Sequence, residues 1–215
     1  MMIVISIVQQ KGGVGKTTLA VNLAGELKSR GSKVTVIDAD PQASAVVWSG
    51  PRKLGFDVRA EVLEDDRLSQ WIRSVLKQPV DYAIVDTPAG LGPVFDAAVD
   101  IADLILVPCG PSSLDLNAAR VTLSRIGSSQ RKDPGLKARI VTVPTRVEAQ
   151  TPEGQQITAE LESFGEVVAP PLSHDVYFVR AFTQGVSVRM AAPSSNAAGE
   201  MRTLADFLLE RLRPT

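Results

Sequence analysis

The chain has 215 residues, of which 44% are hydrophobic, and its formal net charge is -1. A chain of this size suits one α/β domain with a good core, and so small a net charge excludes a general electrostatic attraction to nucleic acid. The single cysteine, Cys109, excludes an intrachain disulfide, and the single histidine, His174, excludes a histidine-based metal site. No stretch reaches the roughly 18 apolar residues of a membrane span, and no signal peptide is evident. We expect a cytoplasmic protein with one domain over residues 1–215.

Seven short strand-like runs alternate with helical segments along the chain. They lie at residues 3–8, 33–37, 57–62, 81–86, 103–107, 138–143 and 166–169. This alternation predicts a mostly parallel, twisted sheet with helices on both faces. Ligands bind at the carboxyl ends of the strands in such sheets, so the residues that follow the strands are the first candidates for a site.

The first run leads into a glycine-rich loop and then into leucines at helical spacing, Leu19, Leu23 and Leu27. A strand, a glycine-rich loop and a helix in this order are typical of a phosphate-binding loop. Its glycines would let backbone N–H groups point at phosphate oxygens. Lys16 would neutralise charge on the β- and γ-phosphates, and the Thr17 hydroxyl would complete a Mg²⁺ shell. The loop reads Gln10-Lys11-Gly12-Gly13-Val14-Gly15-Lys16-Thr17-Thr18.

Carboxylates follow two further runs of the predicted sheet. The run at 33–37 ends in Asp38-Ala39-Asp40-Pro41-Gln42, and the run at 81–86 ends at Asp86. Each acid taken alone would also suit an ordinary turn or helix cap. Because all three follow strands that should end beside the glycine-rich loop, we expect them to converge on the phosphate site.

The loop departs from the general pattern G-x-x-x-x-G-K-[ST], because Gln10 replaces the first glycine and Lys11 adds a cation before the glycines. With this loop and the run 38–42, the chain resembles the ParA/MinD superfamily of deviant Walker ATPases, in particular its short ParF-like members. The resemblance implies an ATPase that binds ATP and Mg²⁺ and forms a nucleotide-sandwich homodimer.

The same resemblance implies roles for individual residues. Lys11 would reach across the dimer to the phosphates held by the partner subunit, and Asp40 would orient or activate the attacking water. Lys11, Lys16 and Asp40 are therefore the catalytic candidates. Thr17, Asp38 and Asp86 are the candidates for holding Mg²⁺, with Asp86 doing so directly or through water.

Two later segments match the superfamily in outline. Residues 108–115 resemble its P-x-x-P-S-x-x-D element at the start of an interface helix, although helix capping by Ser112 or Ser113 would explain these residues without any function. The loop after the run at 138–143 falls where family members often line the adenine pocket. Pro144 and Arg146 are therefore adenine-pocket candidates by position.

The resemblance favours a ParA-type partition ATPase. An ATP dimer would bind nucleoid DNA without sequence preference, and a ParB-like or cargo-adaptor protein would stimulate hydrolysis to segregate a plasmid, a chromosome or a protein assembly. Scattered solvated arginines are the alternative to a DNA-binding patch. The DNA candidates are Arg180, Arg189, Arg202, Arg211 and Arg213.

Other classes of protein are less favoured. A MinD-like membrane-surface ATPase would need a basic amphipathic C-terminal helix, but Glu200, Asp206 and Glu210 dilute the positive charge of residues 199–212. A P-loop ligase or kinase with a small-molecule acceptor does not explain Lys11. An iron–sulfur reductase of the same superfamily would need two cluster cysteines in each subunit.

Overall fold

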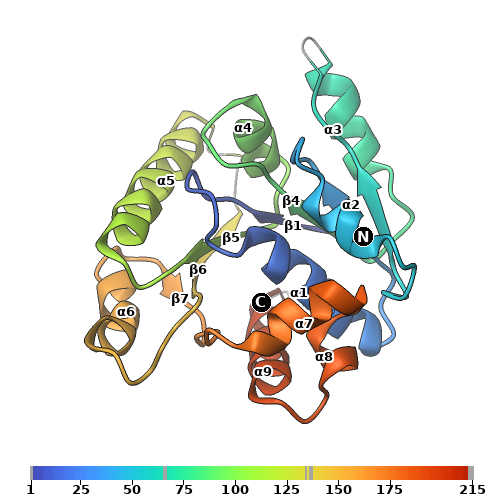
Figure 1. The fold of residues 1–215 in the computed structure, drawn as a ribbon. Coiled ribbons are helices and arrows are strands. Elements are labelled where there is room, and N and C mark those ends of the chain that lie inside the picture. The colour runs from blue at the N-terminus through green and yellow to red at the C-terminus, as the bar shows by residue number, and fades with distance from the viewer. Residues whose placement is uncertain (1, 65–66, 134, 136–137, 213–215) are drawn as a thin grey trace.

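The computed structural model describes residues 2–64, 67–133, 135 and 138–212 (Figure 1). In this part of the chain one sheet holds seven strands, every pair of them parallel, in the order β3-β2-β4-β1-β5-β6-β7. Both the predicted sheet and its α/β class are confirmed. The strands are β1 Ile3–Ile7, β2 Val34–Asp38, β3 Asp57–Ala60, β4 Tyr82–Asp86, β5 Leu104–Cys109, β6 Arg139–Pro144 and β7 Val167–Val168.

Helices cover both faces of the sheet (Figure 1). One layer contains α1 Lys16–Ser29, α2 Ser44–Ser49, α7 Val176–Gln184, α8 Val188–Ala191 and α9 Asn196–Leu212. The other layer contains α3 Leu68–Leu76, α4 Pro93–Asp100, α5 Ser113–Lys132 and α6 Pro152–Glu162. Side chains alternate along the central strand β1, so Ile5 and Ile7 pack under the first layer and Val4 under the second. This two-sided burial explains why the central strands are largely apolar, whereas the edge strand β3 is largely exposed and carries Asp57 and Arg59.

The strand register brings the predicted acids to one edge of the sheet. Asp38 lies opposite Asp86 in the β2–β4 pair, and Asp86 lies opposite Ile7 in the β4–β1 pair. The glycine-rich loop begins just after Ile7, so both carboxylates end beside it. A topological break also falls here, because β1 sits between β4 and β5 and its loop opens between them.

The C-terminal helices pack against α1, the helix that follows the loop. Asn22 accepts a hydrogen bond of 2.6 Å from the Val188 backbone N–H. Gly25 lies so close to Ser187 that a Cβ on the glycine would stand 2.5 Å from the serine Cβ. These contacts bind the chain around residues 187–188 to the middle of α1.

The last helix, α9, docks on the domain by its apolar face. Among the helices described, none combines the length and apolar character needed to cross a bilayer. The apolar face of α9 is already used in the core, which supports the expectation of a docked helix over a helix lying on a membrane surface. Its buried residues are Ala197, Ala198, Met201, Leu204, Ala205 and Leu208.

Candidate functional site

The glycine-rich loop joins β1 to α1 at the carboxyl edge of the sheet. Gly13 and Gly15 have φ of 73° and 93°, values that favour glycine because a Cβ is strained there. Gly15 is the residue that precedes α1, so the positive end of that helix opens directly from the loop. The sequence places glycine where this backbone needs it, and the result is a cradle of the kind that binds phosphate.

Lys16 is folded back into the loop. Its ammonium donates to the carbonyls of Gln9 at 3.3 Å and Lys11 at 3.2 Å, and the residue is only 7% exposed. Burial lowers the pKa of Lys16 below its usual value, and the charges of Asp86 and Asp40 partly oppose this shift. Lys16 is therefore a buried cation held at the loop by weak contacts with carbonyl oxygens.

Asp86 is a buried carboxylate whose two oxygens have no hydrogen-bond partner in the described residues. Burial raises its pKa to about 7, while the nearby Thr17 hydroxyl and the Lys16 charge act in the opposite direction. A buried carboxylate left without partners is unfavourable unless a cation or a donor completes it. The side chain thus fits the predicted role in holding Mg²⁺.

The other two acids are stabilised by backbone groups. Asp38 is 1% exposed and accepts hydrogen bonds from the N–H groups of Asp40 at 3.2 Å and Val46 at 3.0 Å. Burial raises the pKa of Asp38, and these hydrogen bonds oppose the rise. Asp40 is partly exposed and accepts from the Gln42 N–H at 2.8 Å.

No three His, Cys, Asp or Glu side chains of the described ranges form a ready-made metal cage. Mg²⁺ does not require one, because it is usually held by one or two carboxylates together with substrate phosphate oxygens and water. Asp86 and the Thr17 hydroxyl beside the phosphate loop suit that arrangement.

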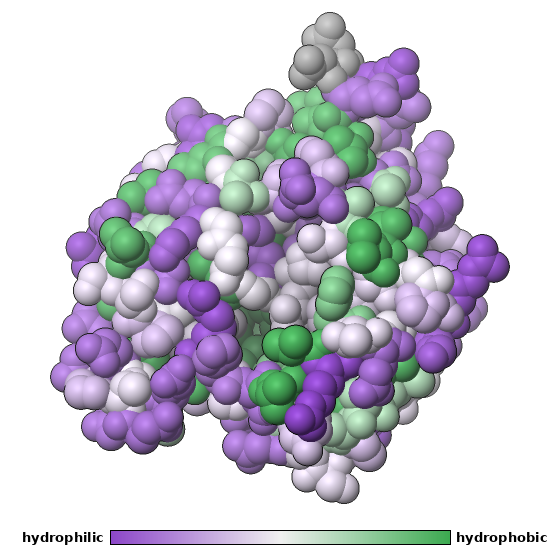
Figure 2. All heavy atoms as spheres, in the orientation of Figure 1, coloured by the Kyte–Doolittle hydropathy of each residue, from purple (hydrophilic) through white to green (hydrophobic). Residues whose placement is uncertain are grey.

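A cavity of about 500 Å³ lies over the loop. Its polar floor comes from Lys16, Thr17 and Asp40, and one wall comes from α2 and α7. Figure 2 shows apolar side chains gathered beside a hollow on this face, over α7. This wall was not predicted from the sequence, because an amphipathic helix does not reveal which cavity it borders. The lining residues are Gly12, Gly13, Gly15, Lys16, Thr17, Thr18, Asp40, Gln42, Ser44, Trp48, Ala89, Phe178, Val179 and Phe182.

A smaller cavity of about 210 Å³ adjoins the loop on the side of β6. Of the two adenine-pocket candidates, Arg146 lines it and Pro144 does not. Pro144 is buried at the end of β6, where its carbonyl accepts from the Leu172 N–H at 2.8 Å. Val14 lines neither cavity, but its carbonyl accepts from the Thr145 hydroxyl at 2.9 Å. The carbonyl groups of Pro144 and Val14 therefore help to fix the backbone around the two cavities.

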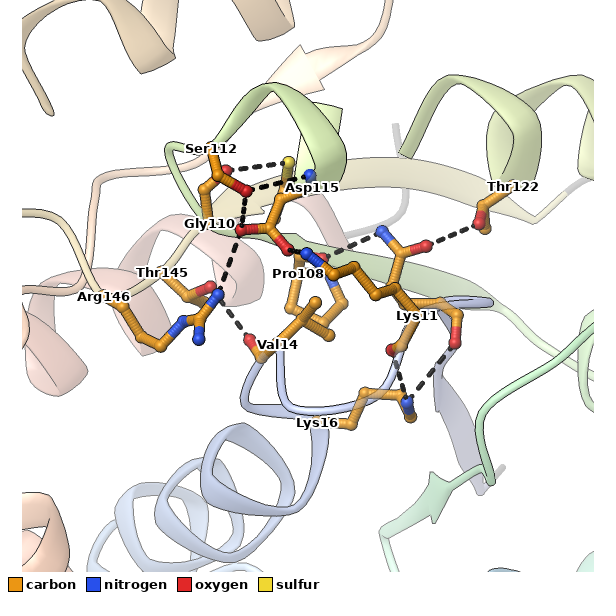
Figure 3. Close-up of polar contacts among 12 residues, drawn as sticks. Lys11, Val14, Lys16, Pro108, Gly110, Ser112, Asp115, Thr122, Thr145 and Arg146 are labelled. Atoms are coloured by element: carbon orange, nitrogen blue, oxygen red, sulfur yellow. Dashed lines mark hydrogen bonds and ion pairs between the residues drawn. The ribbon is translucent and has the colours of Figure 1, made fainter. Parts of the chain in front are cut away.

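Lys11 points away from the large cavity and toward the start of α5 (Figure 3). Its ammonium lies 2.6 Å from Asp115, which also accepts from Ser112 at 2.7 Å and Arg146 at 3.1 Å. Burial raises the pKa of Asp115, but the bonds and charges of these partners outweigh it and leave the pKa below its usual value. Asp115 is 2% exposed, so its charge depends on these partners.

A second buried network fixes the entrance to the loop. The Gln9 side chain donates to the Pro108 carbonyl at 3.2 Å and accepts from the Thr122 hydroxyl at 2.7 Å. The same hydroxyl accepts from the Gln10 N–H at 3.2 Å. Thr122 was not predicted from the sequence, because a threonine inside a helix carries no local mark of a contact 112 residues away.

Two of the DNA candidates are engaged within the domain. Arg189 lies 3.2 Å from Glu26, which is 1% exposed and therefore needs a cation. Arg211 stacks over the Phe207 ring at 3.4 Å and donates to the Phe207 carbonyl. Replacing Arg189 by an acid would put a second negative charge beside the buried Glu26 carboxylate, so such a variant would test folding rather than DNA binding.

The remaining DNA candidates are more accessible. Arg180 is exposed and lies over the Tyr177 ring at 5.1 Å, and Arg202 is exposed on α9. Arg213 lies outside the described residues. Arg180 and Arg202 are thus the better candidates for contact with an external anion.

Residues 5–188 match the family described as CbiA, CobQ/CobB/MinD/ParA nucleotide binding domain. The match spans most of the chain and includes the loop, both acidic segments and the start of α5. The chain belongs to this family and is a ParA/MinD-type nucleotide-binding ATPase, as its sequence predicted.

Two relatives and one solved structure illustrate the kinship. The chain is 31% identical over 209 residues to the maintenance of carboxysome distribution protein A of Halothiobacillus neapolitanus, with 95% of each chain covered. It is 29% identical over 224 residues to Protein ParA of Rhizobium radiobacter, covering 99% of this chain and 100% of that protein. The septum site-determining protein MinD of Pyrococcus horikoshii, solved with Mg-ADP, has the same fold, with a TM-score of 0.79 at 21% identity over 97% of this chain and 96% of that one.

Proposed function

We propose that this protein is a partition or positioning ATPase that forms an ATP-dependent homodimer and binds DNA without sequence preference. A ParB-like or cargo-adaptor protein would stimulate hydrolysis and release the dimer from nucleoid DNA. The cargo would be a plasmid, a chromosome or a protein assembly. The 31% identity to a carboxysome distribution protein and the 29% identity to a ParA protein support this class of function.

The observation that carries the proposal is the separation of the two loop lysines. Lys16 lies at its own loop and lines the large cavity, whereas Lys11 is turned outward onto Asp115 and lines neither cavity at the loop. The Lys11 side chain is 35% exposed, so a second subunit could reach it. A cation in this place suits phosphates held by another copy of the chain better than phosphates in its own loop.

The other site residues divide the chemistry among them. Backbone N–H groups of Gly12 to Gly15 and the Lys16 ammonium would bind the phosphates. Asp40, which reaches the cavity and is partly exposed, would orient the attacking water. Mg²⁺, when bound by Thr17 and Asp86, would offset negative charge on the β- and γ-phosphates, and Asp38 would support it from the next strand.

Replacement of Lys11 by alanine tests the proposal. Lys11→Ala should leave ATP binding by the monomer nearly unchanged and lower the rate of hydrolysis by about a hundredfold or more, as expected for a cation supplied in trans. It should also weaken dimer formation with a non-hydrolysable ATP analogue. Light scattering and a phosphate-release assay measure the two effects. Unchanged dimerisation together with unchanged turnover would refute the role in trans.

DNA binding should appear only with ATP. A chain with a net charge of -1 needs a concentrated basic patch, and a dimer places two copies of that patch on one particle. Arg180→Glu and Arg202→Glu should weaken binding equally on unrelated duplexes, and binding by the native protein should fall steeply as salt rises. Gel shifts over a salt series measure this, with Glu210→Gln as a control on the exposed side of α9. Equal binding without nucleotide would contradict the proposal.

A further inference from the structure

Asp115 is a buried carboxylate that two cations share. Its Oδ1 accepts from Lys11 at 2.6 Å, and its Oδ2 accepts from Ser112 at 2.7 Å and from Arg146 at 3.1 Å (Figure 3). The two cations come from different parts of the fold, Lys11 from the phosphate loop and Arg146 from the loop after β6. In the proposed function Lys11 moves to the phosphates of a partner subunit, whereas Arg146 does not.

The surroundings of Arg146 are shaped for this contact. Its backbone has φ of 53°, in the left-handed region that residues other than glycine seldom occupy. At the end of β5, a Cβ on Gly110 would stand 2.6 Å from both the Arg146 guanidinium and the Asp115 carboxylate. Glycine at 110 leaves the space in which these two groups meet.

The proposed function creates an electrostatic problem at Asp115. When Lys11 moves to the phosphates of a partner subunit, Asp115, whose side chain is 3% exposed in this structure, loses its shortest contact. A buried charge that loses its only cation is strongly unfavourable. Dimer formation would then be opposed by the group that Lys11 leaves behind, unless another cation stays with it.

We propose that Arg146 is a positioning residue that keeps Asp115 paired after Lys11 leaves, and that it thereby favours the ATP-bound dimer. This inference rests on the proposed transfer of Lys11 between subunits. Arg146 acts through Asp115 and Lys11 and need not touch the phosphates. Its exposed fraction of 43% allows the guanidinium to adjust once the ammonium has gone.

A competing role for Arg146 follows from its place beside the smaller cavity, where it would contact the base of the nucleotide. The two roles differ in their dependence on Asp115. A base contact works whether or not residue 115 carries a charge. A counter-ion matters only while the carboxylate is present.

The experiment is a double-mutant cycle of Arg146→Met and Asp115→Asn. Dimerisation is measured by analytical ultracentrifugation with Mg²⁺ and a non-hydrolysable ATP analogue. Arg146→Met alone should weaken the dimer by about tenfold to a hundredfold, the range for losing a hydrogen bond to a charged group. In the Asp115→Asn background the same change should have little effect, because no buried charge remains. Monomer affinity for the analogue should change less than dimerisation.

Two further variants distinguish a specific loss of dimerisation from a folding defect. Arg146→Lys retains a cation and should keep most of the dimer. Arg131→Met removes an arginine from the far end of α5, where it contacts only the neighbouring Ser128 hydroxyl among the described partners, and should match the native protein. Thermal melts of each variant report folding directly.

Two results would overturn the inference in favour of the competing role. One is an equal loss of dimerisation with and without the Asp115 carboxylate, and the other is a loss of monomer affinity as large as the loss of dimerisation. Either would assign Arg146 to the base pocket. A clear effect of Lys11→Ala without any effect of Arg146→Met would overturn this inference alone. No effect of Lys11→Ala would remove the proposed function and this inference with it.

Discussion

Lys16→Met should lose nucleotide binding while keeping a folded protein. The Lys16 ammonium is buried, and among the described residues it donates hydrogen bonds only to the carbonyls of Gln9 and Lys11. A triphosphate would give it a far stronger, charge-assisted partner. Removing one member of a buried charge pair costs about 2–5 kcal/mol, so ATP affinity should fall by about thirtyfold or more.

Titration with a fluorescent ATP analogue measures the affinity, and thermal shift gives an independent readout. Ligand at about 100 times its dissociation constant stabilises a protein by about 2.7 kcal/mol, so the native protein should melt at a higher temperature with ATP and the variant should not. Without nucleotide, the variant should be at least as stable as the native protein, because burial of the lysine charge is unfavourable. Lys28→Met, an exposed lysine on the same helix, is the control. Near-native affinity in Lys16→Met would disprove the assignment of the phosphate loop.

Asp86→Asn should change the pH dependence of stability as well as activity. Burial raises the pKa of Asp86 from 3.8 to about 7 in the folded state, while the unfolded chain keeps the ordinary value. Between these two pKa values the folded protein holds a proton that the unfolded chain has released. The stabilisation that comes from this bound proton is therefore fully present below about pH 4, and it is lost as pH rises toward 7.

The loss should amount to about 3 kcal/mol between about pH 4.5 and about pH 7.5, at about 1.36 kcal/mol for each pKa unit. An asparagine side chain cannot ionise, so the stability of the variant relative to the native protein should rise by that amount over this range. Urea unfolding without nucleotide or metal at the two pH values measures it. The variant should also lose the effect of Mg²⁺ on ATP binding and hydrolysis.

Asp40→Asn is the matched control for this experiment. It removes a partly exposed carboxylate from the same cavity but leaves Asp86 in place, so most of the fall in stability between the two pH values should remain. Stability curves for Asp86→Asn that run parallel to the native curves would show that Asp86 is ionised and satisfied in the folded protein. The proposed use of that carboxylate for Mg²⁺ would then lose its main structural support.

Much of the fold was readable from local patterns. All seven predicted strands are found within two residues of their expected bounds, because short β-type runs bounded by turns carry their own signal. The bounds differ at the ends, as at β5, which extends to Cys109 instead of residue 107. Parallel pairing to β6 continues through Pro108 and Cys109, and this pairing is a property of the neighbouring strand.

The site divides in the same way. The loop glycines and Lys16 were predicted from their spacing, and the acids at the ends of β2 and β4 from their place in the predicted sheet and from the family resemblance, since each lies within a few residues of the strand that positions it. The partners of Lys11 and Arg189 were not found. Lys11 and Asp115 are 104 residues apart, and Arg189 and Glu26 are 163 residues apart.

The sequence by itself therefore indicated the family, through the resemblance of its loop and acidic segments, and the strand–loop–helix unit. It also predicted which residues are candidates for binding phosphate and Mg²⁺, because these candidates lie at short spacing from the strands. Only the tertiary structure decided which charge meets which. Strand order places β5 and β6 beside the loop, so Asp115 and Arg146 come within reach of Lys11. Helix packing sets Arg189 against Glu26 instead of leaving it for an external anion. Such ion pairs join distant parts of the chain. They form only once the helices have packed on both faces of the sheet.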